Sequence, residues 1–291
     1  MSKIVSTKKT SAIFLAIVLV TGIIAAISPS FIIGVNAQAE PYYGMDKRYN
    51  SYEPDYGMDI YKKPKIFPVN KVSELGDRWW QLISGLDSTV INPFTDIGQA
   101  GCDVGLQDNG KLLFLVGSNR DEKTGDFPVH ECDVKKGTSI LFPIVNVVCD
   151  TLEINTPFFG ANEQDQRICA NDLLDKAPIS ELHVTIDGFE VKNPEQYRID
   201  SPAGGFNINA VENNPVGIPA GSGSGVSDGF WILLKKLQPG EHIISFSGVL
   251  DFTEVPDLED VLEYGATYIL DVQPPEISYY PENYQQNYQK Y

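Results

Sequence analysis

The sequence is poor in the residues and motifs that indicate catalysis. It has only 3 histidines, and His130, His183 and His242 lie far apart and share no motif. It contains no CxxC or HxxxH spacing of the kind that binds zinc. It also lacks the Gly-x-Ser-x-Gly elbow of many hydrolases. The Gly-Ser repeat over 219–225 is not such an elbow, and we predict that it forms a flexible surface loop. Catalytic residues are therefore unknown, and a protein that is not an enzyme is favoured.

Basic residues are scarce as well. The chain has 22 Lys and Arg against 39 Asp and Glu, which gives a formal net charge of -17. The acidity lies entirely in segment 67–278, whose net charge is -20. Such a field repels phosphate backbones, so nucleic acid is excluded as a partner. The field would attract cations, but solubility in a salty exterior is the preferred explanation.

The first 39 residues have the order of a secretory signal peptide. Three lysines precede an apolar run over 12–27, and small residues follow it. We expect cleavage after Ala37 or Ala39. The alternative is an uncleaved anchor over 12–35, which could cross a bilayer of roughly 30 Å.

Both interpretations of this segment predict the same location for the rest of the chain. The lysines stay on the cytoplasmic side, so the protein is extracytoplasmic, either secreted or anchored at the outer face of the cytoplasmic membrane. Contact with the membrane is expected only through the N-terminal segment.

Tyrosine-rich flanks surround the acidic segment. Segments 40–66 and 279–291 hold 11 of the 14 tyrosines, and the motif over 40–46 recurs with changes over 53–59. Polar, low-complexity sequence of this kind predicts a disordered linker and a disordered tail. The alternative is an adhesive role, since tyrosine offers a large contact area at low entropic cost.

Periodicity predicts one globular domain over 67–278. A helix is expected over 72–86, with Ser73 as its cap, Trp79 on its apolar stripe and Trp80 off the stripe as an exposed ligand contact. A short polar helix is expected over 162–176. Short strands are expected over 111–116, 139–148, 182–187, 230–234, 242–246 and 264–272.

Two details refine this pattern of strands. Pro143 interrupts the second strand, which predicts an edge position or a bulge. The Pro-Gly pair at 239–240 predicts a hairpin or a sandwich corner. The fold class is therefore mainly β, an immunoglobulin-like or jelly-roll-type sandwich with one N-terminal helix and short helical insertions.

The four cysteines predict two disulfides, because an even number in an exported chain is typical of such bonds. Three connectivities are possible. We favour Cys102–Cys132 and Cys149–Cys169, because these pairs are sequential and bracket separate units. Each bond would contribute about 3–4 kcal/mol in the chain-entropy model.

Acidic clusters are candidate calcium sites. The densest cluster spans 251–263, where Asp251, Glu254 and Asp257 are candidate metal ligands. The preferred interpretation is a short amphipathic helix with a solvated acidic face. Asn119, Asp121 and Asp126 form a second candidate, with Lys123 at a position that a ligand would occupy. No other cofactor is indicated.

The order of several motifs resembles a family of secreted archaeal and bacterial proteins that have a β-rich domain and no known activity. The resemblance covers roughly 73–273 and implies export and a β-rich domain, but no reaction. The motifs are Trp79-Trp80, Asn92-Pro93, Gly101-Cys102, Leu112 to Gly117, Ile140 to Ile144 with Asn146, Asp187-Gly188, Ser227 to Trp231, and Pro239 to His242 with Phe246 and Gly248.

Three functions are compatible with these observations. The preferred one is a non-enzymatic binding or structural module of the cell envelope, with an envelope component or a glycan as its partner. The second is a secreted hydrolase of glycans or esters that uses carboxylates, because aromatic pairs that include Trp80 and Trp231 suit stacking on sugars. The third is a Ca²⁺-stabilised surface domain. The oligomeric state is not indicated.

Overall fold

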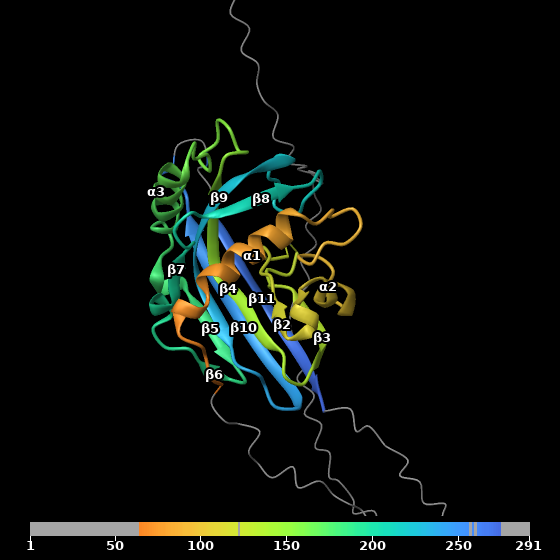
Figure 1. Cartoon of the computed structure of the whole chain (residues 1–291). Helices are drawn as coiled ribbons and strands as arrows, with labels where there is room; N and C mark the ends of the chain where they lie inside the picture. The colour runs from red at the N-terminus through yellow and green to blue at the C-terminus, as the bar shows by residue number, and fades with distance from the viewer. Residues whose placement is uncertain (1–63, 122, 256–257, 259–260, 275–291) are drawn as a thin grey trace, which may run out of the picture. The chain divides into compact units, whose positions relative to one another are not determined.

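The computed structural model describes residues 64–121, 123–255, 258 and 261–274 (Figure 1). The predicted leader, the tail and nearly all of the predicted linker lie outside these residues and stay predictions. The described strands are β1 (Leu106–Gln107), β2 (Leu112–Phe114), β3 (Val129–Lys135), β4 (Ser139–Asp150), β5 (His183–Ile186), β6 (Phe189–Glu190), β7 (Arg198–Asp200), β8 (Phe206–Ala210), β9 (Gly221–Leu234), β10 (Gly240–Asp251) and β11 (Val261–Gln273).

Helices are fewer and shorter than strands. The described α-helices are α1 (Ser73–Ser84), α2 (Gln99–Val104) and α3 (Glu163–Leu174). Single 3-10 turns are η1 (Val69–Lys71), η2 (Asp108–Gly110), η3 (Ile179–Glu181) and η4 (Pro194–Tyr197). Among the described residues, no helix is long and apolar enough to cross a membrane.

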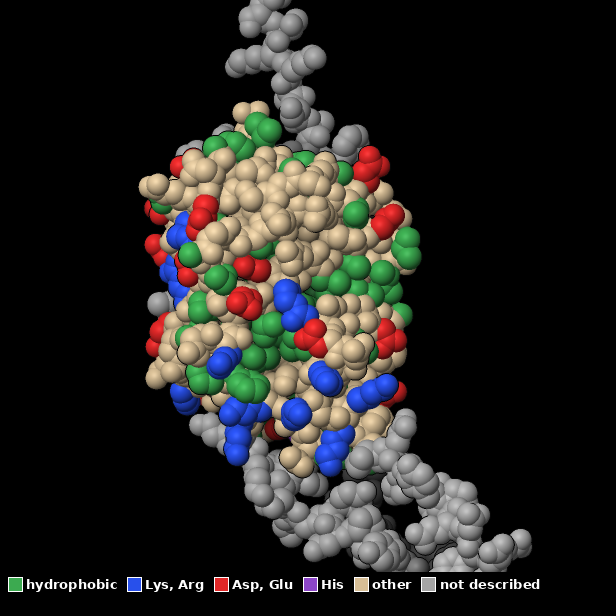
Figure 2. Space-filling model, in the orientation of Figure 1, with side chains coloured by type: hydrophobic (Ala, Val, Ile, Leu, Met, Phe, Trp, Pro, Cys, Tyr) green, Lys and Arg blue, Asp and Glu red, His purple; other side chains and the backbone are tan. Residues whose placement is uncertain are grey.

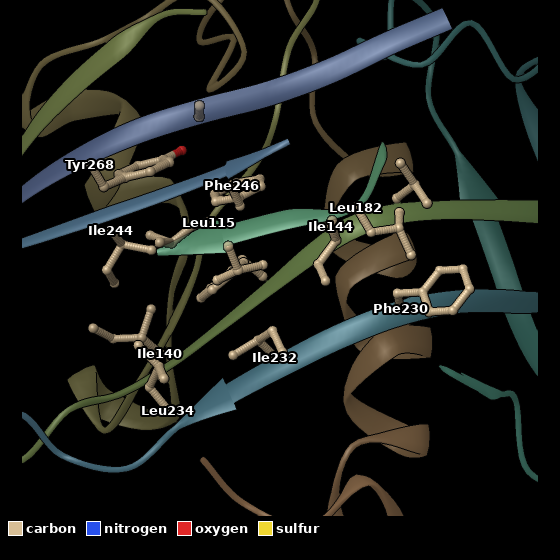
Figure 3. Close-up of a cluster of buried hydrophobic side chains, with 14 of the residues drawn as sticks. Leu115, Ile140, Ile144, Leu182, Phe230, Ile232, Leu234, Ile244, Phe246 and Tyr268 are labelled. Atoms are coloured by element: carbon tan, nitrogen blue, oxygen red, sulfur yellow. The ribbon is translucent and has the colours of Figure 1, made fainter. Parts of the chain in front are cut away.

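The strands form two mixed sheets that face each other. The first has the order β1-β2-β4-β9-β7, with β8 also paired to β9, and the second has the order β3-β11-β10-β5-β6. β2 runs parallel to β4 and β3 runs parallel to β11, while the other pairs are antiparallel. Inward side chains of both sheets form the main core, including Ile140, Ile232, Phe246 and Tyr268 (Figure 3). The prediction of a mainly β sandwich is confirmed.

A second core lies on the outer face of the first sheet, where α1 packs across β4 and β9 (Figure 1). Trp79 of α1 meets Trp231 of β9 edge to face at 5.8 Å, and its indole Nε1 donates to the carbonyl of Leu115 at 2.9 Å. The apolar stripe of α1 therefore covers strands that are buried on both faces. This explains why most of β4 and the segment 230–234 of β9 are apolar without alternation.

Pro143 produces the predicted bulge. The register of β4 against β9 shifts between Pro143 and Val145. On its other side, β4 pairs with β2 only as far as Leu141. Proline has no N–H to donate to a neighbouring strand, so pairing with β2 ends just before this position. Beyond Leu141, that edge of β4 has no strand partner among the described residues until Asp150 bridges to Phe159.

Both predicted disulfides are present. Cys102 of α2 bonds to Cys132 of β3, and Cys149 of β4 bonds to Cys169 of α3, with Cα separations of 5.9 and 6.1 Å. Each bond ties a helix to one of the two sheets. Such bonds are typical of oxidising surroundings outside the cytoplasm.

Three local predictions were wrong. Ser73 does not cap α1, because the capping residue is Val72 and Ser73 is the first helical residue. The Gly-Ser tract over 221–225 is not a loop but the start of β9, where it pairs with β8. Val261 to Glu263 do not belong to a helix, because they begin β11 and pair with the end of β10.

Candidate functional site

A cavity of about 340 Å³ lies along the free edge of β4. Asn146, Val147 and Val148 of β4 line it, in the stretch between the end of β2 pairing at Leu141 and the bridge at Asp150. Ser118 and Asn119 bound it where the chain leaves β2 and crosses to Gly265 of the second sheet. The cavity therefore lies where β4 has no strand partner on this side among the described residues.

The walls of this cavity, which we call the edge pocket, come from both sides of the first sheet. The outer layer contributes Trp80 and Phe94, and the loop before β9 contributes Pro215, Val216 and Ile218. The second sheet and adjoining loops contribute Phe158, Leu250, Phe252, Leu262 and Tyr264. Mostly apolar walls with a few polar groups are typical of small-molecule sites, and the volume falls within the usual range.

Glu153 is the one carboxylate that lines the edge pocket among the described residues. It follows β4 in a turn held by the fully buried Asp150, whose Oδ1 accepts the N–H groups of Leu152 at 2.7 Å and Glu153 at 3.0 Å. Burial, together with the nearby Asp150 carboxylate, raises the pKa of Glu153 to about 8. Burial also raises the pKa of Asp150. Glu153 is therefore mainly a neutral acid at pH 7 and can donate a hydrogen bond.

Two further hydrogen-bond donors belong to residues that line the edge pocket. The indole Nε1 of Trp80 and the amide Nδ2 of Asn146 are buried and have no partner among the described residues. Buried donors are usually paired with protein or water, so these two are exceptions that call for a partner. The pocket residues therefore include two donors without a partner in the described part of the chain, besides the acid form of Glu153.

The two tryptophans predicted as ligand contacts have different outcomes. Trp231 is 1% exposed beneath α1, so the prediction that it contacts a ligand was wrong. Its face of β9 is covered by the helix rather than open to solvent. Trp80 is 8% exposed and packs edge to face on Trp79, so it is not an exposed contact as predicted, but it does line the edge pocket.

The three histidines are not brought together. His130 is buried on β3, and His183 is exposed on β5. His242 on β10 is held by the carboxylate of Asp187 at 2.7 Å and the carbonyl of Gln238 at 2.9 Å, which occupy both of its ring nitrogens. His242 is thus a structural residue of the Pro-Gly corner.

The calcium candidates do not form a ligand set in the part of the chain that is described. Asp251 accepts the N–H and the hydroxyl of Thr253, and Asp121 accepts the N–H groups of Lys123 and Thr124. No group of three or more His, Cys, Asp or Glu residues that could hold a metal ion occurs among the described residues. Asp257 lies outside them, so calcium binding by Asp251, Glu254 and Asp257 stays a prediction.

Glu153 and Asn146 were not singled out from the sequence as site residues. Glu153 is one of 39 acidic residues, and its raised pKa depends on contacts that only the fold creates. Pro143 was the one available signal, because a proline inside an apolar strand marks an end of pairing. The free edge that follows it could have been inferred from that position.

On the face shown in Figure 2, Lys and Arg side chains gather toward the lower end and Asp and Glu are spread over the remainder. The acidic charge of the domain is therefore unevenly distributed on this face. The edge pocket itself is lined by no Lys, Arg or His side chain among the described residues.

Comparisons with known proteins place the chain in no family. No family model matches it, and no curated protein matches it. The solved "Structure of PbICP-C in complex with falcipain-2" contains a chain that is similar over 56% of this chain and 100% of that chain, with 13% sequence identity and a TM-score of 0.21. At this TM-score the similarity establishes neither fold nor function.

Proposed function

We propose that the protein is an exported, disulfide-bonded module of the cell envelope that binds an envelope component or glycan in the edge pocket. The observation that supports this most directly is the pocket itself, which has aromatic walls and two residues whose buried donors lack a partner in the described part of the chain. Aromatic rings suit stacking on sugar faces, and polar groups at a few positions orient such a ligand. The N-terminal leader and the two disulfides fit a location outside the cytoplasm.

The geometry favours binding over hydrolysis. Two-carboxylate hydrolysis of glycosides needs two acids that flank the bond to be cleaved. Among the described residues, Glu153 alone lines the pocket, and one oxygen of its neighbour Asp150 is occupied by the two turn N–H groups. Asp150 is fully buried and serves to hold the turn.

A substitution that fills the edge pocket tests whether the ligand binds there. Val216 lines the edge pocket and is only partly exposed, so Val216→Trp should occupy the cavity. Val211 lies in the same connection, is 37% exposed and does not line the pocket, so Val211→Trp is the matched control. The experiment compares binding of the oxidised chain from residue 40 onward to isolated envelope polysaccharide from the source organism.

The expected result is binding by the wild type and by Val211→Trp, and at least tenfold weaker binding by Val216→Trp. Melting temperatures of the three proteins establish that the variants fold. Equal binding by a folded Val216→Trp, or no binding by the wild type, contradicts the proposal.

A further inference from the structure

The charge of the edge pocket restricts its ligand. Its polar lining consists of Ser118, Asn119, Asn146, Glu153 and Tyr264, besides the Trp80 indole. No cationic side chain of the described residues lines it, so an anionic ligand would gain no ion pair there. The strongly acidic chain also disfavours an approaching anion.

A cationic ligand is disfavoured for a different reason. The turn at Asp150 places Glu153 beside a carboxylate that is itself fully buried, and burial together with this neighbour raises the pKa of Glu153 to about 8. The other titratable group that lines the pocket is the Tyr264 phenol of β11, whose pKa is also raised by burial. At neutral pH the described lining therefore carries little charge and offers O–H and N–H donors.

Three hydrogen-bond donors belong to residues that line the pocket. Glu153 carries a proton at neutral pH, and the Trp80 Nε1 and Asn146 Nδ2 donors have no partner among the described residues. A ligand with uncharged oxygen acceptors can accept hydrogen bonds from such donors, and no charged group has to be buried when it binds. Hydroxyl, ether and acyl oxygens on a ring meet this requirement, and the faces of the same ring can contact the aromatic walls.

We infer that the edge pocket takes an uncharged sugar residue and that Glu153, which lines the pocket, donates a hydrogen bond to one of its oxygens. This inference rests on the proposed function and adds to it the class of ligand and the role of Glu153. The cavity of about 340 Å³ suits a small ligand such as one sugar unit rather than a long segment of polymer.

The test uses two matched series of monosaccharides. Glucose, glucosamine and glucuronic acid share one skeleton, and galactose, galactosamine and galacturonic acid share another, so each series compares a neutral, a cationic and an anionic sugar. Binding to the oxidised chain from residue 40 onward is measured at pH 6.5 by saturation-transfer NMR and by calorimetry. The expected result is that the neutral member of at least one series binds at least fivefold more tightly than its charged relatives.

The role of Glu153 is tested through pH. For the wild type, affinity for the neutral sugar should fall roughly tenfold between pH 6 and pH 9, because a group with a pKa of about 8 is mostly ionised at pH 9. Glu153→Gln keeps a donor at every pH, so this variant should bind and lose that pH dependence. Glu212→Gln alters an exposed glutamate that does not line the pocket and should retain the wild-type profile.

The possible results test the inference and the proposed function separately. Tighter binding of a charged sugar, or a pH dependence that persists in Glu153→Gln, overturns the inference. If no neutral sugar binds while Val216→Trp still weakens binding to envelope polysaccharide, the ligand class is wrong and the proposed function stands. If Val216→Trp changes nothing, the proposed function itself fails.

Discussion

The imidazole of His130 on β3 lies flat against the phenol ring of Tyr268 on β11, with ring centroids 4.3 Å apart and planes inclined by 8°. The two residues are register partners in the parallel pair of strands, and both are buried. The phenol hydroxyl of Tyr268 donates to the carbonyl of Val116 at 3.0 Å, whereas Nε2 of His130 has no partner among the described residues. The stack therefore contains a neutral imidazole in the core of the sandwich.

This imidazole should make the protein sensitive to acid. Burial lowers the pKa of His130 to about 4 from its ordinary value of 6.5. The unfolded chain therefore binds a proton more readily than the folded one, and stability is lost as pH falls from about 6.5 toward 4. Between pH 7 and pH 4.5, the free energy of unfolding of His130→Phe should fall by roughly 2 kcal/mol less than that of the wild type. Urea unfolding at the two pH values measures this difference. His183→Phe, at an exposed position on β5, is the control and should retain the loss.

Asp77 should have the opposite effect. This carboxylate of α1 is 6% exposed and accepts hydroxyl hydrogen bonds from Ser201 at 2.5 Å and Ser227 at 3.1 Å, which join α1 to the first sheet. Burial raises its pKa to about 6 despite these two bonds. The folded-state pKa of Asp77 lies above the unfolded value of 3.8. The stability that the protonated form of Asp77 contributes is therefore complete below pH 3.8 and is lost as pH rises through 6.

Asp77→Asn keeps an acceptor for the two serines and removes the charge. We expect this variant to be more stable than the wild type at pH 8, by an amount on the order of 2 kcal/mol, and to show no such gain at pH 4. Thermal or urea unfolding at the two pH values measures the difference. A variant that is destabilised equally at both values would show that Asp77 is charged and favourably bound in the folded state.

The two disulfides should contribute similar amounts of stability. The bonded cysteines are separated by 30 and 20 residues, and the chain-entropy model gives about 3–4 kcal/mol for loops of these lengths. Replacement of either pair by alanine should lower the free energy of unfolding by that amount, and reduction should lower it further in either double variant. A reductant that leaves the unfolding midpoint of the wild type unchanged would argue against this contribution.

Gly229 on β9 has no room for a side chain. A Cβ at this position would lie 2.4 Å from the Trp231 Nε1 atom and 2.8 Å from the Cβ of Asn146. Gly229→Ala should therefore destabilise the protein by about 1–3 kcal/mol through overpacking, and should disturb Asn146 in the edge pocket. Gly98→Ala, with nothing within 4 Å of the added Cβ, should cost less than about 1 kcal/mol. Equal costs would show that the strand shifts to accept the methyl group.

Sequence patterns predicted the elements that side chains define. The apolar run at 139–148 and the alternation over 264–272 became β4 and β11, because buried faces need apolar residues at these periods. The tract over 221–225 was missed, because it is held in β9 by backbone pairing, mainly with β8, and by polar contacts rather than by apolar side chains. At Gly223 an added Cβ would lie 2.3 Å from Thr151 Oγ1, so the absence of a side chain is itself what permits the packing.

The edge pocket was beyond prediction for a physical reason. Its lining combines residues from 80 to 264 that meet only once both sheets have formed. Trp80 was expected at the surface because it falls off the apolar stripe of α1, yet the helix is flanked by the segments carrying Phe94 and Ile218, which cover that side as well. The apolar stripe of a helix predicts which of its faces packs on a sheet. It does not predict which of its other residues are buried by neighbouring loops.

The parallel pairing of β3 with β11 has a consequence for folding. Residues 129–135 of β3 pair with residues 267–273 of β11, which is the last strand among the described residues. The edge strand β3 therefore joins the second sheet only after β11 has been made. Contacts between such distant positions raise the contact order and slow folding. Until residue 267 arrives, β3 has an unpaired edge, and a chain truncated before that point would present this edge to other chains as a template for aggregation.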